Sequence, residues 1–138
     1  MTLVVIDASA GAEIVVDTRR GRALARLLPP DAEGRVPEHF YAEVLAVVRR
    51  RLLIDRAVPE ARAAGAVERL GSWRLRRASV APLLAPAWRY RHNMTAADAL
   101  YVALAEHLGA EFLTDDHRLV DAPTFPQQVG VLRLAARR

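Results

Sequence analysis

The sequence contains no cysteine and no lysine. The absence of cysteine excludes disulfides, thiolate zinc sites and cysteine nucleophiles, and it fits a reducing compartment. Because all 20 basic residues are arginine, a lysine Schiff base and the lysine of a Walker A loop are excluded as well. No apolar run approaches the ~18 residues of a membrane span, and Asp7 stands where a signal peptide would continue its apolar core. We therefore expect a cytoplasmic protein with no membrane partner.

The length and the charge set further bounds. The 138 residues predict one domain over 1–138, large enough to bury about two thirds of its unfolded surface. The net charge of +4 favours a polyanionic partner. Arginine clusters lie at 49–51, 74–77, 89–92 and 137–138. For any single cluster an ordinary solvated face is the more economical interpretation, with arginine replacing lysine through genomic base composition.

Strand and helix patterns alternate along the chain. Strands are predicted at 2–6, 75–81, 111–113 and 131–134. Helices are predicted at 9–16, 19–28 and 84–91, from Thr95 to Gly109, and as a brief turn at 117–121. Pro37 at a first-turn position predicts a long helix to about residue 54, and Pro59 predicts another to about residue 70. This alternation predicts an α/β fold whose central sheet is mainly parallel and carries helices on both faces.

Four acids either follow a predicted strand or lie within a predicted helix: Asp7, Glu43, Asp98 and Asp116. Asp7 and Asp116 follow short apolar strands, and in parallel sheets the functional crevice lies beyond the carboxyl ends of the strands. Ionised acids at the rim of an apolar core are hard to desolvate, so several together suggest a neutralising metal ion. The structural alternative for Asp7 and Asp116 is that each caps the helix that follows it.

Asp98 and Glu43 lie within predicted helices. Asp98 follows Thr95 at the spacing of a capping box. Its helix is apolar almost all round and should be buried, so a carboxylate away from the polar side also indicates an internal site. Glu43 lies at the edge of an apolar stripe, where a lone acid is more often a solvated residue. His39, four residues earlier, is its candidate partner.

Taken together, these segments resemble the PIN domain family, and within it the VapC-type toxin ribonucleases of bacterial toxin–antitoxin pairs. The resemblance spans nearly the whole chain in order, spacing and length. The matching segments are Val4 to Ala10, Ala42 to Val44, Thr95 to Ala105 and Phe112 to Leu119. The third segment followed by Thr114-x-Asp116 is specific, whereas the opening Asp7-x-Ser9 is weak alone.

The resemblance implies roles for individual residues. Asp7, Glu43, Asp98 and Asp116 would form the catalytic pocket for Mg²⁺ or Mn²⁺, with the three aspartates as direct ligands and Glu43 bound directly or through water. Ser9 and Thr114 would position water or orient the ligands. Asp115 occupies a position that is usually not acidic in the family, and both a further ligand and a solvent-facing residue are compatible with it. Ala46 and Ala97 depart from residues that are common in relatives, and neither departure removes an acid.

The implied function is metal-dependent hydrolysis of RNA phosphodiester bonds by the toxin of a toxin–antitoxin pair. The implied partners are an RNA substrate, a small cognate antitoxin and a second copy of the chain in a homodimer. The alternative is a PIN-like module that binds RNA or protein without cleaving. Presence of all four acids favours the enzyme, because a module without metal would be expected to lose mutually repelling carboxylates. A phosphatase with Asp7 as nucleophile is weaker, since Ser9 stands where its second aspartate is expected.

Overall fold

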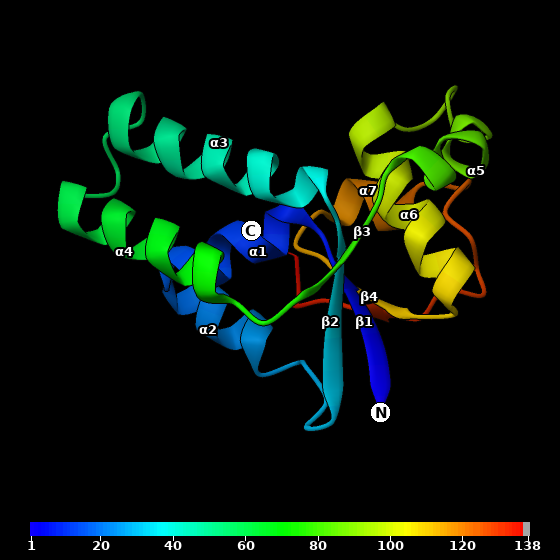
Figure 1. The fold of residues 1–138 in the computed structure, drawn as a ribbon, viewed down its shortest axis with the longest axis horizontal. Coiled ribbons are helices and arrows are strands. Elements are labelled where there is room, and N and C mark those ends of the chain that lie inside the picture. Colours follow the sequence, from blue (N-terminus) through cyan, green and yellow to red (C-terminus); the bar gives the residue numbers. More distant parts are fainter. Residues whose placement is uncertain (137–138) are drawn as a thin grey trace.

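Five parallel strands form one sheet in the computed structural model, which describes residues 1–136 (Figure 1). Their order across the sheet is β3-β2-β1-β4-β5, and every neighbouring pair is parallel. The strands are β1 (Thr2–Ile6), β2 (Ala32–Pro37), β3 (Arg76–Ala78), β4 (Glu111–Leu113) and β5 (Val131–Leu132). The expected α/β architecture is therefore confirmed. The arginine pair at 137–138 lies outside the described residues.

Helices cover both faces of the sheet. Figure 1 shows α1 to α4 on one side and α5 to α7 on the other. Their bounds are α1 (Ala8–Val16), α2 (Arg19–Ala25), α3 (His39–Leu53), α4 (Glu60–Ser72), α5 (Leu84–Trp88), α6 (Ala96–Leu108) and α7 (His117–Asp121), with a 3₁₀ turn at Ala81–Leu83. No helix within residues 1–136 is long and apolar enough to cross a membrane.

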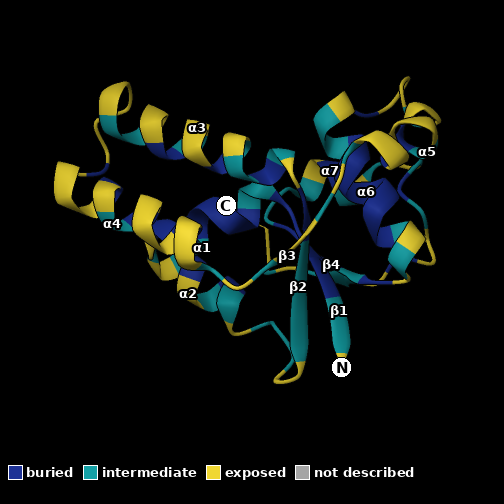
Figure 2. Ribbon diagram, viewed as in Figure 1, coloured by how far each residue is buried: buried dark blue, intermediate teal, exposed yellow. Residues whose placement is uncertain are grey.

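The core lies between β1 and the helices on either side of it. Val4, Val5 and Ile6 point to alternate faces of the central strand, and all three are buried. In α6 every residue from 99 to 105 is buried, as its nearly continuous apolar sequence predicted. Figure 2 shows this buried centre, with exposed residues along the outer sides of α3 and α4.

The sequence analysis missed β2 and misplaced Pro37. Pro37 is the last residue of β2, not the first turn of a helix, and α3 begins at His39. Pro37 lies beyond Arg35, where the pairing of β2 with β1 ends, so its missing N–H is not needed in that ladder. Four of the six residues of β2 are only partly buried. A strand in this environment needs no continuous apolar run, so its sequence did not indicate a strand.

Several predicted elements are also shorter in the structure. The strand expected at 75–81 is limited to Arg76–Ala78, and the strand expected at 131–134 to Val131–Leu132. The helix expected at 19–28 ends at Ala25, and the helix expected at 84–91 ends at Trp88.

Candidate active site

Asp7 lies at the carboxyl end of β1 and caps α1. Its Oδ1 accepts hydrogen bonds from the Ala10 backbone N–H at 3.0 Å and from the Ser9 hydroxyl at 2.6 Å. Its Oδ2 accepts a short hydrogen bond from the Thr114 hydroxyl. Asp7 is only 4% exposed. The capping role is thus confirmed, and both carboxylate oxygens are held in fixed directions.

The environment of Asp7 opposes its negative charge. Burial raises the pKa of the carboxyl from 3.8 to about 6, even though the hydrogen bonds from Ser9, Thr114 and Ala10 lower it, and the charge of Asp116 adds to the rise. Donated hydrogen bonds therefore do not fully replace the lost solvation. A cation beside Asp7 would supply the missing stabilisation.

Thr114 and Asp116 reach Asp7 because β4 runs beside β1. Ile6 is in register with Leu113, and the Asp7 backbone N–H donates to the Leu113 carbonyl at 3.1 Å. The residues that follow the two strands are therefore neighbours. The Asp116 N–H donates to the Thr114 hydroxyl at 2.9 Å. The Asp116 carboxylate accepts from the N–H of Leu119 at 3.2 Å, which confirms its role as the cap of α7.

Asp98 lies in the first turn of α6, near Asp116 and Glu43. Its N–H donates to the Thr95 hydroxyl at 3.2 Å, which confirms Thr95 as the helix cap. The pKa of Asp98 is raised, first by burial and then by the charges of Asp116 and Glu43, while a hydrogen bond with Thr95 and the nearby His39 act in the opposite direction. Asp98 is thus within electrostatic reach of two other acids of the predicted set.

Glu43 projects from α3 and is held by two side chains. The Tyr101 hydroxyl donates to Glu43 Oε1 at 2.8 Å, and His39 Nε2 lies 3.6 Å from the same oxygen. His39 is therefore the partner that the sequence suggested. The Glu43 side chain is 35% exposed, so the rest of its carboxylate remains open to water.

Tyr101 is a site residue that the sequence analysis did not identify. The side chain is buried, and its pKa is raised by burial, by the hydrogen bond to Glu43, and by the charges of Glu43, Asp7 and Asp98. The phenol hydroxyl therefore lies among three of the four acids. From the sequence alone, Tyr101 is expected to be a core residue of an apolar helix. The one sequence feature that could have placed it in the site is its position three residues after Asp98, because residues three apart lie on the same helix face.

The four predicted acids converge at the carboxyl end of the sheet. Asp116 acts electrostatically on both Asp7 and Asp98, and Glu43 acts on Asp98. They come from β1, α3, α6 and the loop after β4. Segments far apart in the sequence thus bring these acids near one another, and we call this group the acidic pocket; the Ser9 and Thr114 hydroxyls beside Asp7 lie 3.3 Å apart.

The chemistry of the pocket fits a hard divalent cation. Asp7, Asp98 and Asp116 offer carboxylate oxygens, the ligands that Mg²⁺ and Mn²⁺ prefer. Among the described residues no ion pair joins any of these three to an arginine. Residues 1–136 contain no group of three or more acidic or histidine side chains already close enough to ligate one ion. Direct coordination by all three aspartates would therefore require their carboxylates to draw closer around the ion, whereas coordination through water would not, because Mg²⁺ commonly keeps several waters.

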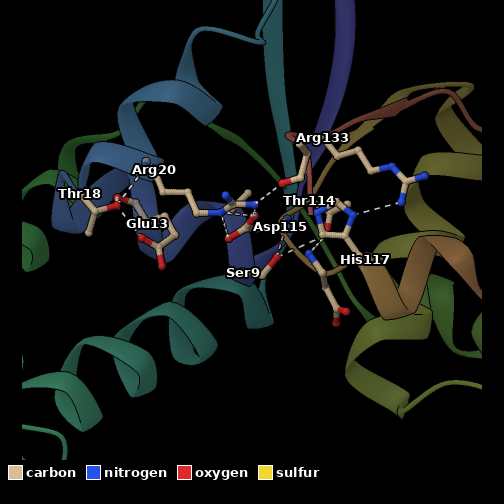
Figure 3. A network of polar contacts seen from close by, with 12 residues as sticks. Ser9, Glu13, Thr18, Arg20, Thr114, Asp115, His117 and Arg133 are labelled. Carbon is tan, nitrogen blue, oxygen red and sulfur yellow. Dashed lines mark hydrogen bonds and ion pairs between the residues drawn. The ribbon is translucent and has the colours of Figure 1, made fainter. Parts of the chain in front are cut away.

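Asp115, the additional acid between Thr114 and Asp116, pairs with an arginine. Figure 3 shows its carboxylate facing Arg20 of α2. The Arg20 Nε donates to both carboxylate oxygens, at 2.8 and 2.9 Å. The Asp115 side chain is only 6% exposed. It is therefore not the solvent-facing residue that the sequence left open, and its charge is balanced by an arginine.

Comparison with known proteins identifies relatives over most of the chain. The sequence profile of the PIN domain matches residues 4–124. Ribonuclease VapC1 of Mycobacterium tuberculosis is 34% identical over 130 residues, which cover 94% of this chain and 97% of the relative. Ribonuclease VapC3 of the same organism is 36% identical over 127 residues, with 92% of each chain covered.

Solved structures share the fold at lower identity. The Mycobacterium tuberculosis toxin VapC20, described as cleaving the sarcin-ricin loop, superposes with a TM-score of 0.62 at 21% identity, covering 90% of this chain and 97% of that one. A toxin–antitoxin complex from Klebsiella pneumoniae gives 0.64 at 14% identity, covering 97% and 99%. VapBC2 from Rickettsia felis, bound to a promoter DNA fragment, gives 0.61 at 11% identity, covering 96% and 98%.

Proposed function

The chain belongs to the PIN domain family, and on that basis we propose that it is a metal-dependent endoribonuclease that acts as the toxin of a toxin–antitoxin pair. The ribonuclease activity and the toxin role are those of its VapC relatives, which match nearly the whole chain. The proposal includes a cytoplasmic site of action and a requirement for Mg²⁺ or Mn²⁺. The observation that supports it best is the proximity of Asp7, Glu43, Asp98 and Asp116: burial and then the charges of these acids raise the pKa values of Asp7, Asp98 and the Tyr101 hydroxyl near them.

Three of these acids would hold the metal directly. In this proposal Asp7, Asp98 and Asp116 are the ligands, and Glu43 takes part directly or through a water molecule. When bound, the cation would lower the pKa of a water molecule and offset the charge of the scissile phosphate. Support comes from the buried Asp7 carboxylate, whose charge hydrogen bonds alone do not satisfy.

The remaining polar groups orient these acids. Ser9 and Thr114 donate to different oxygens of Asp7, so that the carboxylate cannot rotate freely. Tyr101 fixes Oε1 of Glu43 and leaves Oε2 available to hold a water or accept its proton. An oriented carboxylate ligand beside a water-accessible proton acceptor would favour hydrolysis, because it combines positioning with general base catalysis.

RNA, an antitoxin and a second copy of the chain are the proposed partners. Exposed arginines at 49, 50, 74, 76, 77, 89 and 91 offer phosphate contacts. Structural neighbours include complexes of such toxins with their antitoxins, which supports extending a small cognate antitoxin to this chain. The second copy of the chain would form a homodimer with the first.

Cleavage of RNA by the purified protein tests this function. We expect cleavage with Mg²⁺ or Mn²⁺, none with chelator, and a loss of at least about a hundredfold in Asp7→Asn and Asp98→Asn, because each removes a charged ligand. Asp17→Asn is the matched control, since Asp17 is exposed at the end of α1 and its carboxylate pairs with Arg22. Cleavage that survives both substitutions would reject the pocket. Failure to cleave any RNA would favour a non-cleaving PIN-like module.

A further inference from the structure

Arg20 joins three separate segments beside the acidic pocket. Its guanidinium binds Asp115 through Nε and through Nη2, which lies 2.7 Å from Oδ1. The same Nη2 donates to the carbonyl of Ala135 at 3.1 Å. Arg20 thus connects α2, the loop after β4 and the end of the described chain. With Nε and Nη2 engaged in this way and its side chain only 22% exposed, Arg20 is poorly placed to contact an RNA phosphate.

The backbone of Asp115 leads from Arg20 to the pocket. The Asp115 N–H donates to the Ser9 hydroxyl at 2.9 Å, and that hydroxyl donates to Asp7 at 2.6 Å. On either side of Asp115 stand Thr114, which binds Asp7, and Asp116. A displacement of Asp115 would therefore move its neighbours Thr114 and Asp116, and it would break the hydrogen bond between the Asp115 N–H and Ser9.

The start of α2, which carries Arg20, is fixed by hydrogen bonds within α2 and to α1. The Thr18 hydroxyl caps α2 by accepting from the N–H of Gly21 at 2.8 Å, and it donates to the carboxylate of Glu13. Glu13 is buried and pairs with Arg51 of α3 at 2.5 Å. A Cβ at Gly21 would lie 1.9 Å from the Glu13 carbonyl oxygen, so glycine permits this close approach of α2 to α1. Figure 3 shows Glu13 and Thr18 beside Arg20 in this network.

We propose that Arg20 is a positioning residue for the metal pocket: its bidentate hold on Asp115 keeps that carboxylate out of the pocket and fixes the loop that presents Thr114 and Asp116. This inference rests on the proposed metal-dependent function. A charge-assisted, bidentate guanidinium pair is both strong and directional. Without it, the nearly buried Asp115 carboxylate would lose its bidentate partner next to Asp116, and the loop that carries Thr114 and Asp116 would rearrange.

Binding of Mn²⁺ to the metal-free protein, without RNA, tests the inference. We would titrate the wild type, Arg20→Ala and Arg20→Lys, and follow free Mn²⁺ by electron paramagnetic resonance. Loss of a group that orients metal ligands commonly weakens metal binding 10- to 100-fold, so the Kd of Arg20→Ala should rise by at least about tenfold. Arg20→Lys should fall between, because lysine keeps the charge but lacks the planar fork. Arg22→Ala, an exposed arginine on the same helix, should bind as the wild type does.

The possible outcomes distinguish a failure of the positioning role of Arg20 from a failure of the proposed metal-dependent function. An unchanged Kd in Arg20→Ala, beside a wild type that binds Mn²⁺, would overturn the positioning role and leave the ribonuclease proposal standing. A wild type that binds no Mn²⁺ would overturn the proposed metal dependence and the inference together.

A double variant guards against simple loss of folding. Arg20→Ala combined with Asp115→Ala removes the carboxylate that Arg20 binds as well as the arginine. We expect its thermal midpoint to recover toward that of the wild type while its Mn²⁺ affinity stays low, because the loop remains unanchored. Recovery of both would show that Arg20 serves only to balance the charge of Asp115, and would overturn the inference.

Discussion

At the residue scale, the electrostatics of Asp7 set the character of the pocket. The carboxylate is buried and receives three hydrogen bonds, yet its pKa is raised to about 6. Desolvation therefore outweighs hydrogen bonding at this site. A residue selected for stability alone would be neutral here, so the retained charge indicates that Asp7 serves binding or catalysis.

Asp7→Asn should stabilise the metal-free protein at neutral pH. Because the folded pKa of Asp7 exceeds its unfolded value of 3.8, the contribution of Asp7 to stability is fully present below about pH 4 and is lost as the pH rises through 6. A shift of roughly two units corresponds to about 3 kcal/mol. Urea unfolding in chelator should show the variant gaining stability over the wild type between pH 4 and pH 8. The same difference at both values would contradict this.

Tyr101→Phe should separate activity from stability. Loss of the hydroxyl leaves Glu43 without its closest donor, so the RNA cleavage rate should fall by about tenfold, as for other groups that orient metal-site ligands. The free energy of unfolding should change by only about 1 kcal/mol, since one hydrogen bond is lost. Tyr90→Phe is the matched control, because Tyr90 donates to Glu106, outside the acidic set. Equal rates for the two variants would remove Tyr101 from the site.

At the element scale, the pocket depends on β1, β4 and α6. These elements were predictable because their apolar patterns are strong: β1 is central and buried, and α6 is buried over seven consecutive residues. The strand β2 was not predictable, because its sequence, Ala-Glu-Gly-Arg-Val-Pro, contains two charged residues, a glycine and a proline in place of an apolar run. Arg35 lies opposite Arg76 in β3, and Glu33 pairs with both arginines. Such contacts become apparent only when the sheet has formed.

Thr95→Ala should weaken the start of α6. The Thr95 hydroxyl accepts from the Asp98 N–H, and loss of such a cap costs about 1 kcal/mol. Thermal or urea unfolding should show this decrease, while Thr95→Ser should restore most of the stability because it keeps the hydroxyl. A Thr95→Ala variant as stable as the wild type would show that tertiary packing alone fixes this end of the helix.

At the scale of the whole molecule, a basic protein surrounds an acidic pocket. The net charge is +4, and most arginines of the clusters are exposed, as expected of solvated faces. Arg51 is an exception, because it turns inward to pair with buried Glu13. No pattern in the sequence distinguished Arg51 from its neighbours Arg49 and Arg50. The sequence pointed to the four acids as a set, whereas the pairs Tyr101–Glu43, Arg20–Asp115 and Arg51–Glu13 depend on three-dimensional contacts.

RNA binding should therefore depend steeply on ionic strength. Binding of a single-stranded RNA in chelator, measured by fluorescence anisotropy, should weaken by about tenfold or more between 50 and 200 mM salt, because arginine–phosphate contacts release counterions. Affinity that does not change with salt would contradict a role for the arginine clusters in holding RNA.

Anomalous diffraction from crystals soaked in Mn²⁺ tests the central claim most directly. We expect an anomalous difference peak among the carboxylates of Asp7, Asp98 and Asp116, and its loss in crystals of Asp98→Asn. A peak elsewhere, or none in the wild type at saturating Mn²⁺, would contradict the assignment of these acids as a metal site.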